Sequence, residues 1–322
     1  MDQNQNQNQK NFALIGAAGY IAPRHMRAIK ETGNKLIAAL DPFDSVGIID
    51  SFFPQADFFI ETERFDRHLD KLRRLGNGHV DYVSICSPNY LHDAHIRLAL
   101  RNEAHAICEK PLLLNPWNLE GLEEIEKETG KKIYNILQLR HHPTIIDLKN
   151  RIDNSPKDKV HDIQLTYITS RGNWYYYSWK GNILKSGGVV TNIGIHFFDM
   201  LSWIFGDVEK STVHLMERNK ASGLLQLKNA NISWFLSLDK NDLPAKAVEN
   251  NQPTHRSIRV DNEEIEFSGG FTDLHTVSYQ EILNGKGYGI GAARQSIEIA
   301  HKIRNQEVTE KSGDFHPLLS SL

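Results

Sequence analysis

The first 140 residues alternate short apolar runs with longer segments whose apolar residues recur at helical spacing. The apolar runs predict strands over residues 12–15, 35–40, 58–60, 80–86, 104–108 and 132–137. The segments between them predict helices over residues 23–32, 65–75, 90–101 and 119–129. Strands separated by helices of this length are typical of βαβ units, so this half is predicted to be an α/β, doubly wound parallel sheet.

Beyond Arg140 the pattern changes to alternating apolar and polar residues, with many aromatic side chains. It predicts strands over residues 160–167, 211–216, 223–227, 230–238, 257–260 and 263–267, and helices over 144–152, 192–205 and 291–305. Strands with this period of two are typical of an antiparallel sheet with one solvated face. The second half is therefore predicted to be an α+β domain with a large, mainly antiparallel sheet.

A chain of 322 residues is longer than a typical single domain, which agrees with two separate cores. The predicted division is a disordered polar lead over residues 1–10, a first domain over 11–140 and a second domain over 141–322. The formal net charge of −3 gives no electrostatic footprint for nucleic acid or an anionic membrane. No apolar stretch reaches the roughly 18 residues that span a bilayer, and no leader indicates secretion. We therefore expect a cytoplasmic protein.

The two cysteines, Cys86 and Cys108, both fall within apolar runs. A cysteine in such a run is more often a small, reduced core residue than a nucleophile or a metal ligand. The sequence therefore predicts no disulfide and no metal site.

A glycine-rich turn, Gly-Ala-Ala-Gly-Tyr-Ile-Ala, joins the first predicted strand to the first predicted helix. Small residues at Gly16, Gly19 and Ala22 let backbone N–H groups approach a pyrophosphate at the helix N-terminus. The spacing is one residue longer than the usual G-x-G-x-x-G fingerprint, and a plain structural connector is the alternative. The turn predicts a Rossmann dinucleotide site whose contacts are Gly16, Ala17, Gly19, Tyr20 and Ile21.

Asp41 ends the second predicted strand and lies 25 residues after Gly16 (41 − 16). An acidic side chain about this far along can accept hydrogen bonds from a ribose hydroxyl. An ordinary turn or capping aspartate is the alternative. Because the carboxylate would repel a 2′-phosphate, Asp41 favours NAD over NADP as the cofactor.

Two polar turns follow the fourth and fifth predicted strands, at the same carboxyl edge of the sheet as the glycine turn. The first contains Ser87, Pro88, Asn89 and His92, and the second is Glu109-Lys110-Pro111. An unpaired ammonium is costly to bury, so a lysine at this strand end is expected to face a ligand. Helix capping is the alternative for the serine and the asparagine. The sequence leaves the isomer of the bond before Pro111 open.

A glycine-rich segment leads into the helix predicted over residues 192–205, where His196 follows Asn192 by four positions. Residues four apart are neighbours on a helix surface. A histidine among isoleucine and phenylalanine is by itself more often a core residue. Combined with Lys110, it predicts acid–base chemistry that favours His196 as the base and Lys110 as the donor to an oxygen that gains negative charge. The sequence leaves open which of the two accepts the proton.

Together, these motifs resemble the glucose–fructose oxidoreductase / inositol dehydrogenase / MocA (Gfo/Idh/MocA) family from residue 11 onward. The resemblance implies that Lys110 lies beside the nicotinamide and the reacting carbinol, and that Glu109 and Asn89 line the NAD site. Many members carry an aspartate four positions before the histidine, whereas this chain has Asn192. Because asparagine can orient a hydroxyl but cannot take up a proton, the proton chemistry is expected to rest on Lys110 and His196.

Residues 167–181, just before the histidine motif, are dense in aromatic and basic side chains. Arg171 suits a carboxylate or a phosphate, and Trp174 suits stacking on a sugar or a base. A sheet edge or a subunit interface is the alternative. The segment Arg171-Gly172-Asn173-Trp174, with Asn192 and the glycine turn, resembles one branch of the family. That branch comprises the UDP-N-acetylglucosaminuronate 3-dehydrogenases of bacterial surface-polysaccharide and O-antigen pathways.

The resemblance to this branch implies NAD-dependent oxidation of the C3 hydroxyl of a UDP-N-acetylamino sugar uronate, with 2-oxoglutarate as a candidate acceptor that reoxidises NADH. The substrate-binding residues that it implies are Lys110, Arg171, Asn173, Trp174, Asn192 and His196. Two alternatives stay open: an NAD-dependent dehydrogenase of a simple polyol or free sugar, and a catalytically silent nucleotide-binding sensor. The aromatic-rich sheet of the second half would leave a broad exposed face, which predicts that another subunit buries it in a homo-oligomer. The resemblance favours a homotetramer.

Overall fold

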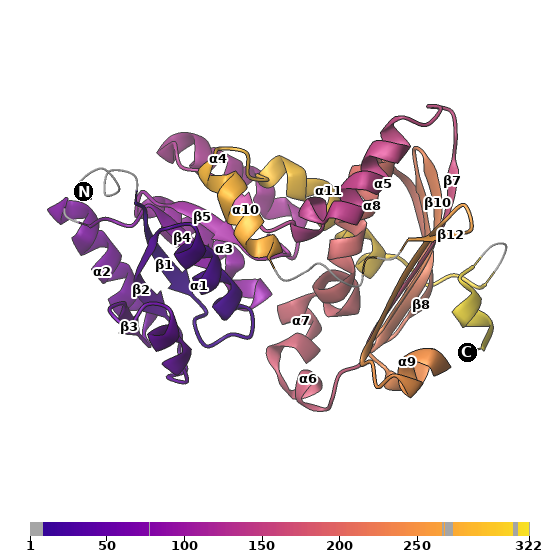
Figure 1. The fold of residues 1–322 in the computed structure, drawn as a ribbon, viewed down its shortest axis with the longest axis horizontal. Helices are drawn as coiled ribbons and strands as arrows, with labels where there is room; N and C mark the ends of the chain where they lie inside the picture. The colour runs from indigo at the N-terminus through magenta and orange to yellow at the C-terminus, as the bar shows by residue number, and fades with distance from the viewer. Residues whose placement is uncertain (1–8, 77, 266, 268–272, 312–314, 322) are drawn as a thin grey trace. The chain divides into compact units, whose positions relative to one another are not determined.

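The computed structural model describes residues 9–321 except 77, 266, 268–272 and 312–314, and its two compact units are drawn in Figure 1. Unit 1 contains residues up to 113, 117–138 and 272–293, and unit 2 contains 114–116, 139–271 and the residues from 294 onward. The lead predicted over residues 1–10 lies outside the described residues up to residue 8. Residues 272–293 return to unit 1, whereas the sequence predicted one boundary at residue 140.

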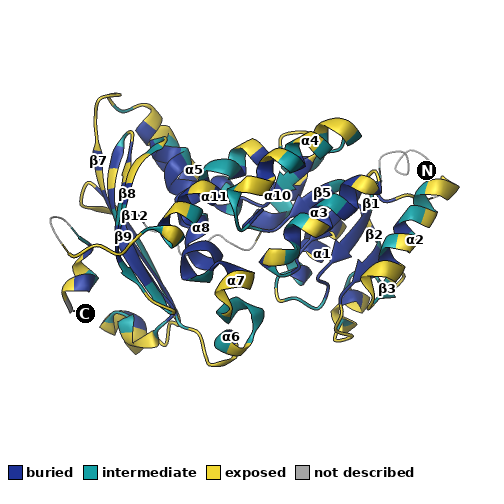
Figure 2. Ribbon diagram, turned by 180° about the vertical axis from the view of Figure 1, so that it is seen from behind, coloured by how far each residue is buried: buried dark blue, intermediate teal, exposed yellow. Residues whose placement is uncertain are grey.

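Unit 1 is built on a six-stranded sheet in the order β3-β2-β1-β4-β5-β6, in which every pairing is parallel. The strands are β1 (Asn11–Ile15), β2 (Lys35–Leu40), β3 (Asp57–Phe59), β4 (Tyr82–Ile85), β5 (His105–Cys108) and β6 (Ile133–Asn135). Their central members are buried nearly throughout, as parallel strands covered on both faces must be (Figure 2). The predicted doubly wound sheet is confirmed.

Helices cover both faces of this sheet. They are α1 (Ala22–Glu31), α2 (Thr62–Leu75), α3 (His92–Arg101), α4 (Leu119–Thr129) and α10 (Leu274–Leu283). The step from β1 to β2 moves in the opposite direction along the sheet from the steps that contain α2, α3 and α4. Right-handed crossovers therefore put α1 on one face and these three helices on the other. Helix α10, which the sequence pattern did not predict, packs against α1 (Figure 1).

Unit 2 contains a second six-stranded sheet in the order β12-β11-β7-β10-β9-β8. Its strands are β7 (His161–Thr169), β8 (Val208–Met216), β9 (Lys220–Leu227), β10 (Ala230–Ser237), β11 (Thr254–Val260) and β12 (Glu263–Ile265). All neighbours are antiparallel except the central pair β7 and β10, which are parallel. The predicted mainly antiparallel sheet is confirmed, with one parallel pair that period-two alternation cannot reveal.

The helices of unit 2 are α5 (Pro143–Asp153), α6 (Trp174–Tyr177), α7 (Ile183–Ser186), α8 (Ile195–Phe205) and α9 (Ala245–Glu249), and α11 (Ile290–Asn305) begins in unit 1 and continues into unit 2. Helix α8 covers one face of the sheet, where Phe198 meets the Trp234 ring edge-on at 5.6 Å between centroids. On the opposite face, Phe235 and Ile168 pack with Leu319 of the last helical turn. The face predicted to be solvated is thus partly apolar and covered by the C-terminal segment.

One helical run, residues 183–205, is long and apolar enough to cross a membrane by length and composition. Within the protein, however, 83% of its most apolar window is buried. The run is not one regular helix, since a π-helical turn, Val190–Gly194, precedes α8 where the sequence predicted a single helix over 192–205. The run therefore belongs to the core of unit 2.

Candidate active site

The glycine turn lies against the carboxyl end of β4. Gly16 has a φ of +89°, and a Cβ added there would lie 2.7 Å from the backbone of Cys86 and Ser87. The N–H groups of Gly16 and Ala17 both donate to the carbonyl of Leu40, at 2.8 and 3.2 Å. Only glycine fits at this position, and its close approach keeps the turn against the carboxyl edge of the sheet, as a dinucleotide-binding turn requires.

Replacing Gly16 with alanine is expected to lower the free energy of unfolding by at least about 2 kcal/mol and to weaken NAD binding, because both φ and the close approach oppose a Cβ. Thermal unfolding and NAD titration measure the two effects. Gly33→Ala is the matched control, since Gly33 also has a positive φ but has no neighbouring atom within 4 Å of an added Cβ. Equal losses in the two variants would show that the contact with β4 is unimportant.

Asp41 is buried at the end of β2 and holds the glycine turn. Its Oδ2 accepts the N–H of Ala18 at 2.9 Å, and its Oδ1 accepts the N–H of Phe43 at 2.9 Å. Each carboxylate oxygen has a further lone pair, so the same side chain can also accept ribose hydroxyls. Asp41 can therefore stabilise the turn, which was the alternative interpretation, and also bind the ribose as predicted.

The two polar turns lie at adjacent strand ends, because Ile85 of β4 is in register with Cys108 of β5. Buried His92 links them: its Nδ1 lies 2.7 Å from the carbonyl oxygen of Pro111 and its Nε2 lies 2.9 Å from that of Ser87. Burial lowers the pKa of His92, although these two carbonyl groups oppose the shift. Because a carbonyl oxygen only accepts, the neutral ring donates to one of these two oxygens in each tautomer, and only the protonated ring donates to both.

The Lys110–Pro111 peptide bond is cis, which settles the isomer that the sequence left open. Ser87 and Asn89 are buried at the same edge, and Asn89 begins a 3-10 turn, Asn89–Leu91, that leads into α3. Tyr20 of the glycine turn is 87% exposed, whereas Ala17 is fully buried. The structure therefore brings the predicted cofactor residues together at one edge of the parallel sheet.

Glu109 is surrounded by residues that sequence reasoning missed. Its Oε1 accepts from Nε2 of His25 at 3.0 Å and from Nε2 of His275 at 2.9 Å, and all three side chains are buried. Burial alone would raise the pKa of Glu109, but the two histidine hydrogen bonds and their charge hold it well below its usual range. No spacing rule links residues so far apart along the chain, so the sequence carried no signal for this cluster.

In unit 2, Asn192 and His196 lie on consecutive turns of the buried run. Asn192 is in the π-helical turn and donates from Nδ2 to the hydroxyl of Tyr175 at 3.0 Å. His196 is half-buried in the first turn of α8. Asp199 fastens this turn through two hydrogen bonds with buried Arg140, at 2.6 and 3.0 Å. His196 therefore sits on a firmly held helix.

The aromatic segment after β7 presents cations beside tryptophan rings. Arg171 and Trp174 are exposed, as is Asn173. Lys180 lies 4.6 Å from the ring centroid of Trp179 and 5.8 Å from that of Trp174. Burial lowers the pKa of Lys180, and the charge of nearby Arg171 lowers it further. Sequence reasoning singled out the arginine and missed the lysine, although a lysine next to tryptophan in this segment was a visible signal.

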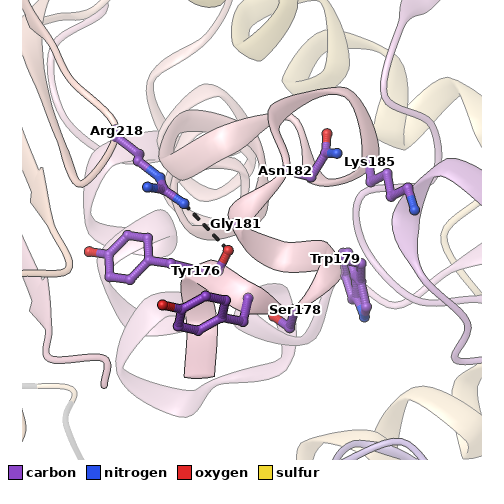
Figure 3. A pocket seen from close by; sticks show the side chains of 8 residues that line it. Tyr176, Ser178, Trp179, Gly181, Asn182, Lys185 and Arg218 are labelled. Carbon is purple, nitrogen blue, oxygen red and sulfur yellow. Dashed lines mark hydrogen bonds between the residues drawn. The ribbon is translucent and has the colours of Figure 1, made fainter. Parts of the chain in front are cut away.

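Two hollows open on this segment, with volumes of about 370 and 410 Å³. Figure 3 shows the first, in which Arg218 lies across from Trp179 and Lys185. The Arg218 guanidinium stacks over the Tyr176 ring at 4.7 Å and donates to its backbone carbonyl at 3.4 Å. The second hollow is lined by Tyr175, Lys180, Gly181, Ile183, Gly187, Gly188, Val189, Val190, Met216, Glu217, Arg218 and Arg304. Both hollows offer cations and aromatic rings, which suits an anionic, ring-containing ligand.

The predicted cofactor residues, Lys110 included, all belong to unit 1, and the other predicted substrate residues belong to unit 2. The pairing of Lys110 with His196 therefore stays a prediction. Both cysteines are free and buried, and burial raises the pKa of each thiol well above its usual value. Neither is suited to act as a thiolate nucleophile.

Two family models match the chain. The model for an oxidoreductase family with an NAD-binding Rossmann fold matches residues 10–136, and the model for the C-terminal alpha/beta domain of the same family matches residues 149–243. Among curated proteins, glucose-6-phosphate 3-dehydrogenase of Bacillus subtilis is 26% identical over 212 residues, which are 61% of this chain and 54% of that protein. The chain thus spans about half the length of this curated relative.

Solved structures extend the similarity to nearly the whole chain. The WlbA (WbpB) dehydrogenase from Thermus thermophilus, in complex with NAD and alpha-ketoglutarate, is 48% identical with a TM-score of 0.93, over 96% of this chain and 99% of that one. A second structure, in complex with NAD and UDP-GlcNAcA, matches at 47% identity with the same TM-score and coverage. WlbA from Bordetella pertussis is 19% identical with a TM-score of 0.74, over 92% of this chain and 94% of that one, which shows a shared fold.

Proposed function

We propose an activity for this chain, which belongs to the Gfo/Idh/MocA oxidoreductase family. It is an NAD-dependent dehydrogenase that oxidises the C3 hydroxyl of UDP-N-acetylglucosaminuronate to a ketone. The observation that carries the proposal is 47% identity over 96% of the chain to a dehydrogenase in complex with NAD and UDP-GlcNAcA. The resemblance of the sequence motifs supports position C3 and a role in bacterial surface-polysaccharide synthesis. A cytoplasmic homotetramer stays a prediction.

The NAD site is proposed at the carboxyl edge of the parallel sheet. The backbone N–H groups of Tyr20 and Ile21, just before α1, would hold the pyrophosphate, because those of Gly16, Ala17 and Ala18 already donate to Leu40 and Asp41. Asp41 would accept hydrogen bonds from the adenosine ribose. The turns that begin at Ser87 and Glu109 would line the nicotinamide end, with His92 keeping them together. When bound, NAD supplies the acceptor for the hydride that leaves the substrate.

Oxidation of the carbinol breaks its O–H and C–H bonds and forms a C=O bond. His196 would take the hydroxyl proton as general base, and Lys110 would donate a hydrogen bond to the oxygen while its negative charge develops. Asn192, whose amide donates to Tyr175, would orient the sugar and not take part in proton transfer. The proton thus leaves through a side chain, while the electron pair of the C–H bond leaves as hydride.

The substrate carries a carboxylate and a diphosphate, so the cations of unit 2 are proposed to bind it. Arg171 would pair with one of these anions, with Asn173 donating beside it and Trp174 stacking on a ring. In the same reaction scheme, 2-oxoglutarate would accept hydride from NADH and a proton, giving 2-hydroxyglutarate and restoring NAD. The alpha-ketoglutarate complex of the Thermus thermophilus relative supports this acceptor.

The proposal is tested by following NADH absorbance with UDP-N-acetylglucosaminuronate, free N-acetylglucosaminuronate and glucose 6-phosphate. We expect kcat/KM for the nucleotide sugar to exceed that for the free sugars by at least about a hundredfold, because binding energy from the nucleotide lowers the barrier. A preference for the free sugars would favour a simple sugar dehydrogenase. Absence of NADH with every sugar, together with measurable NAD binding, would favour a nucleotide-binding sensor.

Asp41 gives a separate prediction about the cofactor. Because its buried carboxylate would face a 2′-phosphate, kcat/KM with NAD is expected to exceed that with NADP by about a hundredfold. Asp41→Asn should reduce this ratio, whereas Asp44→Asn, which removes an exposed carboxylate three residues further on, should leave it unchanged. Faster turnover with NADP than with NAD at equal concentration would refute the assignment of Asp41.

A further inference from the structure

A continuous chain of buried side chains lies behind the Glu-Lys-Pro turn. The hydroxyls of Ser84 and Tyr279 are 2.6 Å apart, and the Tyr279 hydroxyl is 2.8 Å from Nδ1 of His25. Nε2 of His25 and Nε2 of His275 both reach Oε1 of Glu109. All of these residues are buried, and only the Glu109 side chain keeps an appreciable exposed fraction, 11%.

The protons of this chain can be assigned from chemistry. An ionised Glu109 only accepts, so both histidines donate from Nε2. Burial lowers the pKa of His25, although Glu109 opposes the shift, so the ring is neutral and its Nδ1 accepts. Burial raises the pKa of Tyr279 well above its usual value, so its hydroxyl keeps the proton and donates to His25. Every hydrogen bond in the chain therefore runs towards the carboxylate.

Two helices supply the donors. His25 lies on the buried face of α1, and His275 and Tyr279 lie one turn apart on α10, which packs against α1. The two imidazole rings meet edge-to-face with 5.0 Å between centroids. Residues 272–293, which return to unit 1 after the second sheet, thus contribute two of the groups that fix Glu109.

Glu109 also restrains the backbone of the next residue, Lys110. Its Oε2 accepts the backbone N–H of Lys110 at 3.2 Å, and its own N–H donates to the carbonyl of Ile85 at 3.0 Å. Asn135 donates from Nδ2 to the carbonyl of Glu109 at 3.2 Å. The backbone and the carboxylate of Glu109 are therefore both held, which leaves the start of the Lys110 side chain little freedom.

We propose that His25, His275 and Tyr279 are positioning residues that hold Lys110 in place through Glu109. The inference rests on the proposed function, because it assumes that Lys110 contacts the reacting oxygen. A displacement of about 1 Å at a reacting group can cost a hundredfold in rate, so a rigid support for this lysine has a direct catalytic value. We call the three residues and Glu109 the Glu109 clamp.

The same groups also meet the distance requirement of a divalent-cation site. One ligand atom each from His25, Glu109 and His275 lie within 4.8 Å of one another. A cation would need both Nε2 atoms without their protons, whereas the hydrogen bonds to Glu109 need both protons present. Metal analysis of the purified protein separates the two states, and the clamp predicts no stoichiometric metal.

The first experiment compares Tyr279→Phe with Tyr82→Phe, which removes a hydroxyl from another buried ring in unit 1. We expect Tyr279→Phe to lower kcat with UDP-N-acetylglucosaminuronate by about tenfold and to change KM for NAD by less than twofold. His275→Leu should have a larger effect, and His275→Gln should recover most of the activity because its amide can replace the lost donor. Wild-type kcat in Tyr279→Phe and His275→Leu, or stoichiometric metal that His275→Leu loses, would overturn the proposal.

A second readout needs no substrate, so it separates failure of the clamp from failure of the proposed function. Amine acylation of Lys110, followed by peptide mass spectrometry, is expected to be at least about threefold faster in Tyr279→Phe than in the wild type. Exposed Lys185 serves as the internal reference. An unchanged rate at Lys110 contradicts the clamp, whatever the enzyme oxidises. If instead acylation changes and the wild type fails to oxidise the nucleotide sugar, the clamp stands and the proposed substrate is wrong.

Discussion

Replacing Lys110 with methionine is expected to lower kcat by about a thousandfold while changing the Kd for NAD by less than about threefold. Methionine keeps much of the length and apolar surface of lysine but cannot donate a hydrogen bond to the carbinol oxygen. The loss therefore falls on the step in which negative charge develops on that oxygen. NAD binding is spared because the turn that carries Lys110 is held by Glu109 and His92, which the substitution leaves in place.

Steady-state kinetics and NAD titration of Lys110→Met measure this effect. Lys132→Met is a suitable control, since Lys132 is exposed in the same unit, 4.0 Å from Glu126. Near-normal turnover in Lys110→Met would rule out the assigned role. An equal loss of kcat and of NAD affinity would place Lys110 in cofactor binding alone.

Replacing His196 with alanine is expected to lower kcat by about a hundredfold to ten-thousandfold, because the proton of the substrate hydroxyl then has no positioned acceptor. The rate of the wild type should fall at acidic pH, where the imidazole is protonated and cannot accept a second proton. His196→Ala should lose this acidic limb of the pH–rate profile. Added imidazole should restore part of the rate if the cavity left by the side chain admits it.

The pH–rate profile decides between a base and a merely structural histidine. His301→Ala serves as the control, since His301 lies on α11, in unit 2, outside the predicted substrate residues, and is hydrogen-bonded to Asn305. It should leave both kcat and the acidic limb unchanged. An acidic limb that persists in His196→Ala would assign the ionisation to another group. Together with normal turnover, it would remove His196 from the mechanism.

Much of the parallel half could be predicted because its signals are local. The strand predicted over residues 35–40 is β2, and the glycine turn, Asp41 and the two polar turns all lie at one sheet edge as expected. Parallel strands that are buried on both faces read as short apolar runs, and their carboxyl ends must meet. Local pattern and topology were therefore sufficient to gather these residues.

The features that sequence reasoning missed depend on contacts between distant segments. Glu109 and His275 share a hydrogen bond across 166 residues, and no periodicity connects α10 with α1. The parallel pairing of β7 with β10 leaves no mark on period-two alternation. Asn192 lies in a π-helical turn although its neighbours have ordinary helical composition. Each of these features is fixed by tertiary packing, which overrides local preference.

The most direct test of the account uses UDP-N-acetylglucosaminuronate that carries deuterium at C3. Incubation with the enzyme and NAD, followed by mass spectrometry of the reduced cofactor, locates the hydride that is transferred. We predict that the deuterium appears in NADH and that the labelled substrate reacts more slowly than the unlabelled one. Formation of unlabelled NADH from this substrate, or transfer to NAD only from sugars without the nucleotide, would contradict the proposed C3 oxidation.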